Sequence, residues 1–157
     1  MKCYFVRHAA AVNADEWKGD DFDRPLTDKG RARMKEVARR LAALEIDADA
    51  IVSSPLVRAA QTAAIVGDAL SVAVVEDERL GGGFDVDRLA GILRDRSHAD
   101  AIVLVGHEPG MSATIGHAIG GARVDFKKGA IACVEIRDPS APAGELLWMA
   151  PPKILVE

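Results

Sequence analysis

Two arginines and two histidines stand at or just beyond the points where short apolar runs of the chain end. They are Arg7, His8, Arg58 and His107. Two guanidiniums offer fixed forks of donors that match the oxygens of a phosphoryl group. A neutral imidazole nitrogen is a competent nucleophile toward phosphorus, and neighbouring arginine charges disfavour protonation of the ring. These residue types predict a phosphate site in which His8 accepts the phosphoryl group and the other three stabilise its oxygens.

These four residues are far apart in the sequence, so a sheet must bring them together. Apolar runs at 3–6, 50–52, 72–75 and 101–105 alternate with helical patterns at 27–44, 54–70, 86–94 and 111–119. This order is typical of a parallel sheet with helices on both faces, where ligands bind beyond the carboxyl ends of the strands. The pair Ser54-Pro55 predicts a helix start whose free N–H groups face the same anion. Gly106 and Gly110 would let the backbone approach it closely.

The C-terminal part of the chain has a different pattern. The segment 131–136 alternates apolar and polar residues, and a second apolar segment, 146–149, follows a turn rich in Pro and Gly, which indicates a hairpin at the sheet edge. Lys127 and Lys128 precede it, either as a solvated turn or as a contact for an acidic phosphoprotein. We therefore expect one domain over residues 1–157: a three-layer α/β/α sandwich with a mostly parallel central sheet and an antiparallel edge.

The composition is that of an ordinary globular protein, with 157 residues of which 49% are hydrophobic and 28% charged. A net charge of −4 gives no extended basic surface for nucleic acid, so any anion site must be local. Cys3 and Cys133 lie in apolar runs and are interpreted as buried free thiols, with a disulfide as the alternative. No signal peptide or run of ~18 apolar residues is found, which predicts a cytoplasmic protein without membrane contact. The oligomeric state is left open.

Neither a metal nor another cofactor is expected. Asp20, Asp21 and Asp23 crowd the loop before Arg24, but no His or Glu at suitable spacing completes a ligand set. The arginines already supply the positive charge that a metal would provide. The remaining histidines, at 98 and 117, lack the strand-end context and are interpreted as surface or structural residues.

Four motifs in this order resemble those of the histidine phosphatase superfamily, branch 1. They are Arg7-His8-Ala9, Arg24-Pro25-Leu26-Thr27 with Gly30, Ser53-Ser54-Pro55 with Arg58 and Thr62, and Gly106-His107-Glu108-Pro109-Gly110. The short length and the Arg-His-Ala start are most similar to SixA-type phosphohistidine phosphatases, although Ala9 stands where many members have Gly. The resemblance implies a phosphoglycerate-mutase-like fold and a phosphorylated nucleophile at His8. It also implies a phosphate pocket completed by Arg7, Arg58 and His107.

The segment after the third apolar run bears on the substrate. Many members of the superfamily place a Glu there as general acid, but Gly81, Gly82 and Gly83 occupy the matching positions. The nearest carboxylates are Glu78, Asp85, Asp87 and Glu108, and the sequence does not choose among them. A phosphate ester needs such an acid, whereas phosphohistidine releases imidazole, whose conjugate acid has a pKa of ~6.5. The glycines therefore favour phosphohistidine in a protein as substrate.

Other functions remain as alternatives. A phosphatase acting on small phosphorylated molecules would share the fold and the nucleophile. A mutase is less favoured, because the chain lacks long insertions to enclose the site. A non-catalytic module that binds phosphoproteins is a further alternative, against which the intact His8 argues. A receiver domain needs acidic residues after the first strand, and a dinucleotide site needs spaced glycines there, so both are set aside.

Overall fold

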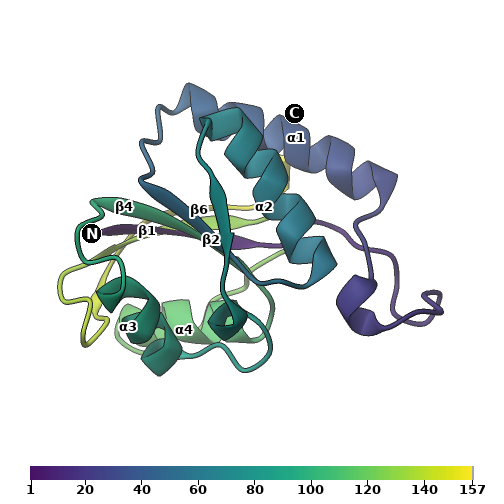
Figure 1. The fold of residues 1–157 in the computed structure, drawn as a ribbon. Coiled ribbons are helices and arrows are strands. Elements are labelled where there is room, and N and C mark those ends of the chain that lie inside the picture. The colour runs from purple at the N-terminus through teal and green to yellow at the C-terminus, as the bar shows by residue number, and fades with distance from the viewer. Residues whose placement is uncertain (157) are drawn as a thin grey trace.

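The computed structural model describes residues 1–156, and its central element is a six-stranded sheet in the order β3-β2-β4-β1-β5-β6 (Figure 1). The strands are β1 (Lys2–Arg7), β2 (Ala50–Ser53), β3 (Val74–Glu76), β4 (Ala101–Gly106), β5 (Ile131–Ile136) and β6 (Gly144–Ala150). The first four strands of that order are parallel, whereas β5 runs antiparallel to β1 and β6 antiparallel to β5. The predicted sheet, mostly parallel with an antiparallel edge, is confirmed.

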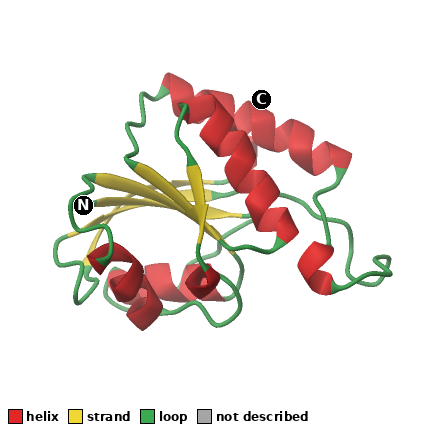
Figure 2. Cartoon of the chain, in the orientation of Figure 1, coloured by secondary structure: helices red, strands yellow, loops and turns green. Residues whose placement is uncertain are grey.

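Helices cover both faces of the sheet, as Figure 2 shows. They are α1 (Asp28–Ala43), α2 (Val57–Leu70), α3 (Val86–Arg94), α4 (Gly110–Ala118) and the short α5 (Pro152–Leu155), with 3-10 turns η1 (Asp21–Asp23) and η2 (Glu78–Leu80). In β1, Cys3 and Phe5 pack toward α3 and α4, while Tyr4 and Val6 pack toward α1 and α2. This period of two places an apolar layer on each side of the sheet, as a three-layer sandwich requires.

The first long helix begins where the sequence predicts, whereas the second does not. The Thr27 hydroxyl accepts from the Gly30 N–H at 2.9 Å and caps α1. The prediction that α2 begins at Ser54-Pro55 is wrong, because the helix begins at Val57 without a side-chain cap. The Ser54 hydroxyl accepts from the Leu56 N–H in the extended entry to the helix.

The third strand is also displaced from its predicted range, since it begins at Val74 instead of Val72. Ser71 has a φ of 57° and ends α2 in the left-handed conformation. The Val72 N–H then donates to Gly67 O at 3.1 Å, which keeps Val72 in the helix-closing turn. None of the helices within residues 1–156 is both long and apolar enough to cross a bilayer.

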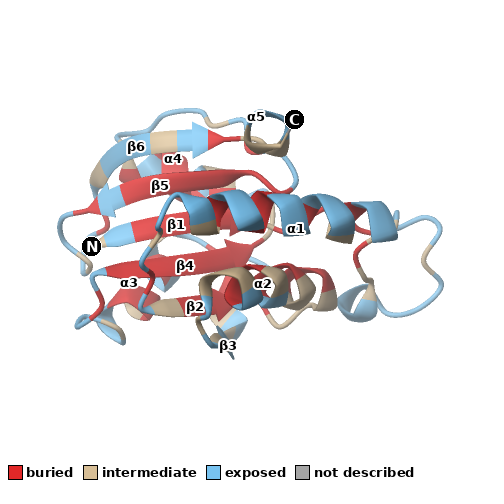
Figure 3. Ribbon diagram, turned by 90° about the horizontal axis from the view of Figure 1, so that it is seen from above, coloured by how far each residue is buried: buried red, intermediate tan, exposed pale blue. Residues whose placement is uncertain are grey.

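The middle strands are buried and the edge strands are exposed, as the colours of β1, β4 and β5 against β3 and β6 show in Figure 3. Cys3 and Cys133 lie on the neighbouring strands β1 and β5, buried and free, as the favoured interpretation expected. Burial raises the pKa of Cys3 to about 12 and also raises the pKa of Cys133.

Candidate active site

The two histidines follow the ends of two adjacent parallel strands. Arg7 at the end of β1 is in register with Gly106 at the end of β4, so His8 and His107 leave the sheet side by side. The His8 N–H donates to Gly106 O at 3.0 Å, and the two imidazole centroids lie 5.2 Å apart. The convergence of strand ends that the sequence predicts is therefore present in the structure.

The ring of His8 is buried, with 8% of its surface exposed, and its tautomer follows from its contact. Nδ1 lies 2.7 Å from the carbonyl oxygen of Ala9, which can only accept, so Nδ1 carries the proton and Nε2 keeps its lone pair. Burial lowers the pKa of His8 to about 3, and the charges of Arg58 and Arg7 act in the same direction against the opposing hydrogen bond to Ala9. Burial, more than the arginine charges named in the prediction, is thus the main cause that favours a neutral ring.

A threonine of α2 holds the loop that carries this ring. The Ala9 N–H donates to Thr62 Oγ1 at 3.1 Å, and that hydroxyl donates to Arg58 O at 2.8 Å. Thr62 is fully buried, so both bonds are sheltered from water. The exit of β1 and the first turn of α2 are thereby fixed relative to each other.

Arg58 is buried in the first turn of α2, where Asp21 of η1 engages it. Its Nη1 donates to Asp21 O at 2.9 Å, and its Nη2 lies 3.2 Å from the Asp21 carboxylate. That carboxylate also accepts from Arg24 Nε at 2.8 Å. The hydrogen bond from Arg24 and the charge of Arg58 hold the pKa of Asp21 below its usual value. Asp21 is thus a site residue that sequence reasoning missed, because it was considered only as a metal ligand.

His107 lies opposite, and Ser54 at the end of β2 fixes its ring. The Nε2 of His107 is 2.7 Å from Ser54 Oγ. Ser54 Oγ already accepts from the Leu56 N–H at 3.2 Å, so its own hydrogen is free to point at His107. Burial first, and then the charge of Arg58, lowers the pKa of His107 to about 4. The serine expected to cap a helix instead orients this histidine.

Several buried nitrogens at this rim find no acceptor on the protein. Within residues 1–156, four buried side-chain polar atoms have no hydrogen-bond partner, and three of them are Arg7 Nε, Arg58 Nε and His107 Nδ1. The Arg7 guanidinium is otherwise held by Phe126, whose carbonyl accepts from Nη1 at 2.8 Å. Buried polar atoms almost always have partners, so three such atoms in one cluster indicate a site for an anionic ligand.

The other predicted site residues lie in different surroundings. A Cβ at Gly106 would lie 2.7 Å from the Met111 side chain and 3.3 Å from Leu80 O, so this glycine makes room for protein groups. Asp85 caps α3 by accepting from the Arg88 N–H, and Glu108 accepts from the N–H and hydroxyl of Ser112. Glu78 is exposed on η2. Among the described residues, no hydrogen bond joins these carboxylates to the two arginines and two histidines of the site.

Side chains able to ligate a metal do not gather in the described part of the chain. Over residues 1–156, no three His, Cys, Asp or Glu side chains lie close enough together to hold a metal ion. Arg7 and Arg58 each place an unpartnered guanidinium nitrogen at the candidate site.

The fold matches solved structures of known phosphatases. The structure of the protein histidine phosphatase SixA complexed with tungstate superposes with a TM-score of 0.88, covering 99% of this chain and 100% of SixA at 24% identity. The α-ribazole phosphatase from Shigella flexneri has a TM-score of 0.75 and covers 97% of each chain at 19% identity. At these identities the likeness establishes the fold, which is the predicted phosphoglycerate-mutase-like one.

Sequence relatives give the family. An uncharacterized protein from Picosynechococcus sp. is 38% identical over 117 residues, which are 69% of this chain and 67% of that protein. The family model of the histidine phosphatase superfamily (branch 1) matches residues 3–82, the part that holds Arg7, His8 and Arg58. The chain therefore belongs to the histidine phosphatase superfamily, branch 1, and its activity is that of a phosphatase.

Proposed function

We propose that the chain hydrolyses phosphohistidine in a protein, with His8 as the nucleophile. The observation that carries this proposal is the short contact between His8 Nδ1 and Ala9 O at 2.7 Å. Because that contact fixes the proton on Nδ1, the lone pair of Nε2 is available for attack on phosphorus. The lowered pKa, about 3, keeps the ring in this form throughout the neutral range.

The reaction takes place in two displacements. In the first, the substrate's ring carries a proton on its other nitrogen. The Nε2 lone pair of His8 forms a bond to phosphorus while the bond from phosphorus to the substrate's imidazole nitrogen breaks, and that nitrogen keeps the electron pair, so the substrate's ring leaves as neutral imidazole. In the second, water attacks the phosphorylated His8 and releases inorganic phosphate and a neutral ring. The double displacement returns His8 to its starting state.

The charge on the phosphoryl oxygens is met by the unpartnered nitrogens of Arg7, Arg58 and His107. A neutral His107 whose Nε2 accepts from Ser54 carries its proton on Nδ1, the nitrogen that has no partner on the protein. Donors that are buried and already oriented stabilise developing charge strongly, because they need no reorganisation during the reaction.

The leaving group distinguishes the substrate classes. A phosphate ester releases an alkoxide and requires a proton donor, whereas imidazole leaves with far less assistance. Asp85 and Glu108 are engaged in local hydrogen bonds at the starts of α3 and α4. Asp21 contacts Arg58, but its lowered pKa keeps it ionised and unable to donate a proton near neutrality. These observations support phosphohistidine over a small phosphate ester. SixA and α-ribazole phosphatase, which share the fold, are named for one substrate of each kind.

The test measures both the intermediate and the preference. A peptide carrying ³²P-phosphohistidine is mixed rapidly with the enzyme, and acid-labile label is expected on His8 and absent from His8→Ala. Turnover of that peptide should exceed turnover of small phosphate esters in kcat/KM, with the chelator EDTA present throughout. Binding of the peptide with neither label on His8 nor turnover would identify a binding module, and a clear preference for esters would reject the phosphohistidine substrate.

A further inference from the structure

A hollow of about 780 Å³ opens beside Arg7, and its charged lining is almost entirely cationic. Its cationic residues are Arg7, Arg33, Lys127, Lys128 and Lys153. Asp125 is the one acidic residue among its described lining residues. The protein as a whole carries a net charge of −4, so this concentration of positive charge is specific to one place. We refer to the hollow lined by these residues as the basic hollow.

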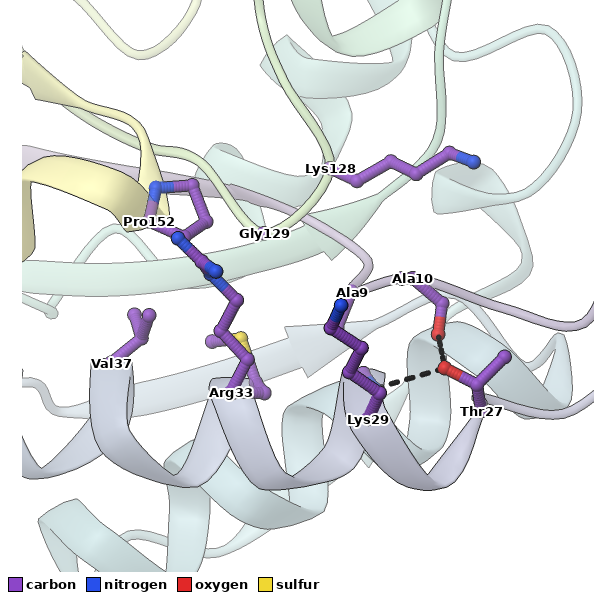
Figure 4. A pocket seen from close by; sticks show the side chains of 11 residues that line it. Ala9, Ala10, Thr27, Lys29, Arg33, Val37, Lys128, Gly129 and Pro152 are labelled. Atoms are coloured by element: carbon purple, nitrogen blue, oxygen red, sulfur yellow. Dashed lines mark hydrogen bonds between the residues drawn. The ribbon is translucent and has the colours of Figure 1, made fainter. Parts of the chain in front are cut away.

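A smaller hollow of about 140 Å³ borders the basic hollow and shares Arg33, Lys128 and Pro152 with it. It adds a further cation, Lys29 of α1. Figure 4 shows Lys29 and Arg33 rising from α1, with Lys128 and Pro152 on the opposite side. The positive lining therefore continues from the basic hollow across the start of α1.

The fold fixes the basic hollow beside the phosphate site. Gly129 has a φ of 73°, and its N–H donates to the carbonyls of both Arg7 and His8 at 3.1 Å. A side chain is strained at that φ, and a Cβ there would lie 3.0 Å from Pro152 Cγ. Lys128 directly precedes Gly129 in the chain, so its backbone is held close to the backbone of His8, the proposed nucleophile.

The lysines of the basic hollow are more exposed to water than the arginines of the pocket. The Lys127 side chain is 64% exposed, and its one ion pair, with Asp125 at 2.8 Å, is itself exposed. Such pairs contribute little, so Lys127 can exchange Asp125 for a carboxylate of a partner at small cost. Lysines are hydrated point charges on flexible stems, which suit dispersed carboxylates better than a single tightly held phosphate.

We propose that the basic hollow binds carboxylates of an acidic segment next to the phosphohistidine of a substrate protein; this rests on the proposed function of His8. Arg7 lines the hollow and also carries one of the unpartnered nitrogens of the phosphate site, so the hollow is within reach of a chain that presents its phosphoryl group to His8. The floor includes Ala130, Met149 and Pro151, apolar surface that a peptide covers and a small polyanion does not. The electrostatic attraction of the exposed lysines raises the encounter rate and selects acidic partners.

The test compares two charge-matched double variants on three substrates. Lys128→Glu with Lys153→Glu reverses charge in the hollow, whereas Lys2→Glu with Lys35→Glu reverses two exposed lysines outside it. The substrates are a phosphohistidine peptide with acidic flanks, the same peptide with Ser and Gln flanks, and phosphoramidate as a P–N substrate without flanks. We expect wild type to prefer the acidic peptide by roughly tenfold in kcat/KM. The hollow variant should lose this preference, and the control variant should keep it.

The three substrates separate the two proposals. Turnover of phosphoramidate by the hollow variant at the wild-type rate shows that folding and chemistry are intact. Equal kcat/KM for the two peptides with wild type overturns the acidic-segment proposal alone. No turnover of any P–N substrate overturns the proposed function itself. Fructose 1,6-bisphosphate is added as a fourth compound, a small ligand with a second phosphate. If the hollow variant loses as much turnover of it as of the acidic peptide, the hollow is assigned to that second phosphate and the proposal is overturned.

Discussion

The pocket around His8 and the basic hollow share Arg7 but differ in how far their other cations are exposed to solvent. In the pocket, Arg58 is 7% exposed and its guanidinium is fixed by Asp21, while in the hollow the Lys127 side chain is 64% exposed. Buried donors act at short range in a medium of low effective dielectric, whereas exposed charges act at long range and are screened by salt. Under the two proposals, the same positive charge favours the reaction step in one place and partner selection in the other.

The largest contrast should come from the nucleophile. His8→Ala is expected to lower kcat by about 10⁴-fold or more, since no other route to the covalent intermediate remains. The Lys128→Ala variant, changed in the hollow, should keep kcat on phosphoramidate. Steady-state kinetics and circular dichroism of both variants provide the measurement. Substantial phosphoramidate turnover by His8→Ala would remove His8 from the proposed mechanism.

Arg58→Ala tests the buried cation next. It removes one preorganised donor, and kcat should fall about 10²- to 10³-fold. Lys127→Ala removes a charge of the same sign from the hollow and should change kcat less than about twofold on any substrate. If the two variants lose kcat equally, burial does not separate the roles of the two regions.

The pH dependence of stability tests burial of the two histidines directly. Their folded-state pKa values, about 3 for His8 and about 4 for His107, lie below the unfolded value of ~6.5. The unfolded chain therefore binds more protons, and the free energy of unfolding, fully present above pH 6.5, falls as the pH drops toward 4. Urea unfolding at several pH values measures this. His8→Gln should flatten the dependence, and an unchanged slope in this variant would show that burial of His8 does not contribute to it.

Asp21→Asn should have a smaller effect than Arg58→Ala, and it should strengthen anion binding at the site where Arg58→Ala impairs the site. The Asp21 backbone carbonyl still holds Arg58 Nη1, but the carboxylate that competes with phosphate for Nη2 is gone. Inorganic phosphate and vanadate should therefore inhibit the variant more tightly, by roughly threefold, because the carboxylate is largely exposed and screened. Inhibition constants measure this. Weaker inhibition would show that the carboxylate positions Arg58 instead of competing for it.

The smallest effect is that of salt. Raising NaCl from 50 to 500 mM should lower kcat/KM for the acidic peptide several-fold, because the exposed lysines of the hollow are screened. The kcat on phosphoramidate should hardly change over the same range, since the charges it needs are buried. Parallel salt dependence of the two substrates would mean that the hollow takes no part in recognition.

The sequence was enough to predict the sheet, both faces of helices and the rim where Arg7, His8, Arg58 and His107 meet. Those predictions depend on strand ends and periodicity, which are local patterns. The sequence did not predict where α2 begins, because the Ser54 hydroxyl can either cap a helix or hold the ring of His107. Only the tertiary position of His107 decides between these two roles. Asp21 was missed for the same reason, since its partner Arg58 is 37 positions away in the chain.

The basic hollow also lay beyond local patterns. Lys127 and Lys128 were noted as a pair, with a solvated turn as one interpretation. Their link to Arg33 and Lys153 exists only after α1 and α5 are packed together with the loop before β5. A surface assembled from several distant segments has no signature in any one of them.

The two buried cysteines have a consequence for how this phosphatase tolerates oxidants. Enzymes that attack phosphorus with a low-pKa thiolate lose activity when peroxide converts that sulfur to a sulfenic acid. In the proposed mechanism the attacking atom is a ring nitrogen, and both thiols of the chain are enclosed within the sheet with raised pKa values. Turnover should therefore continue at peroxide concentrations that silence thiol-dependent phosphatases.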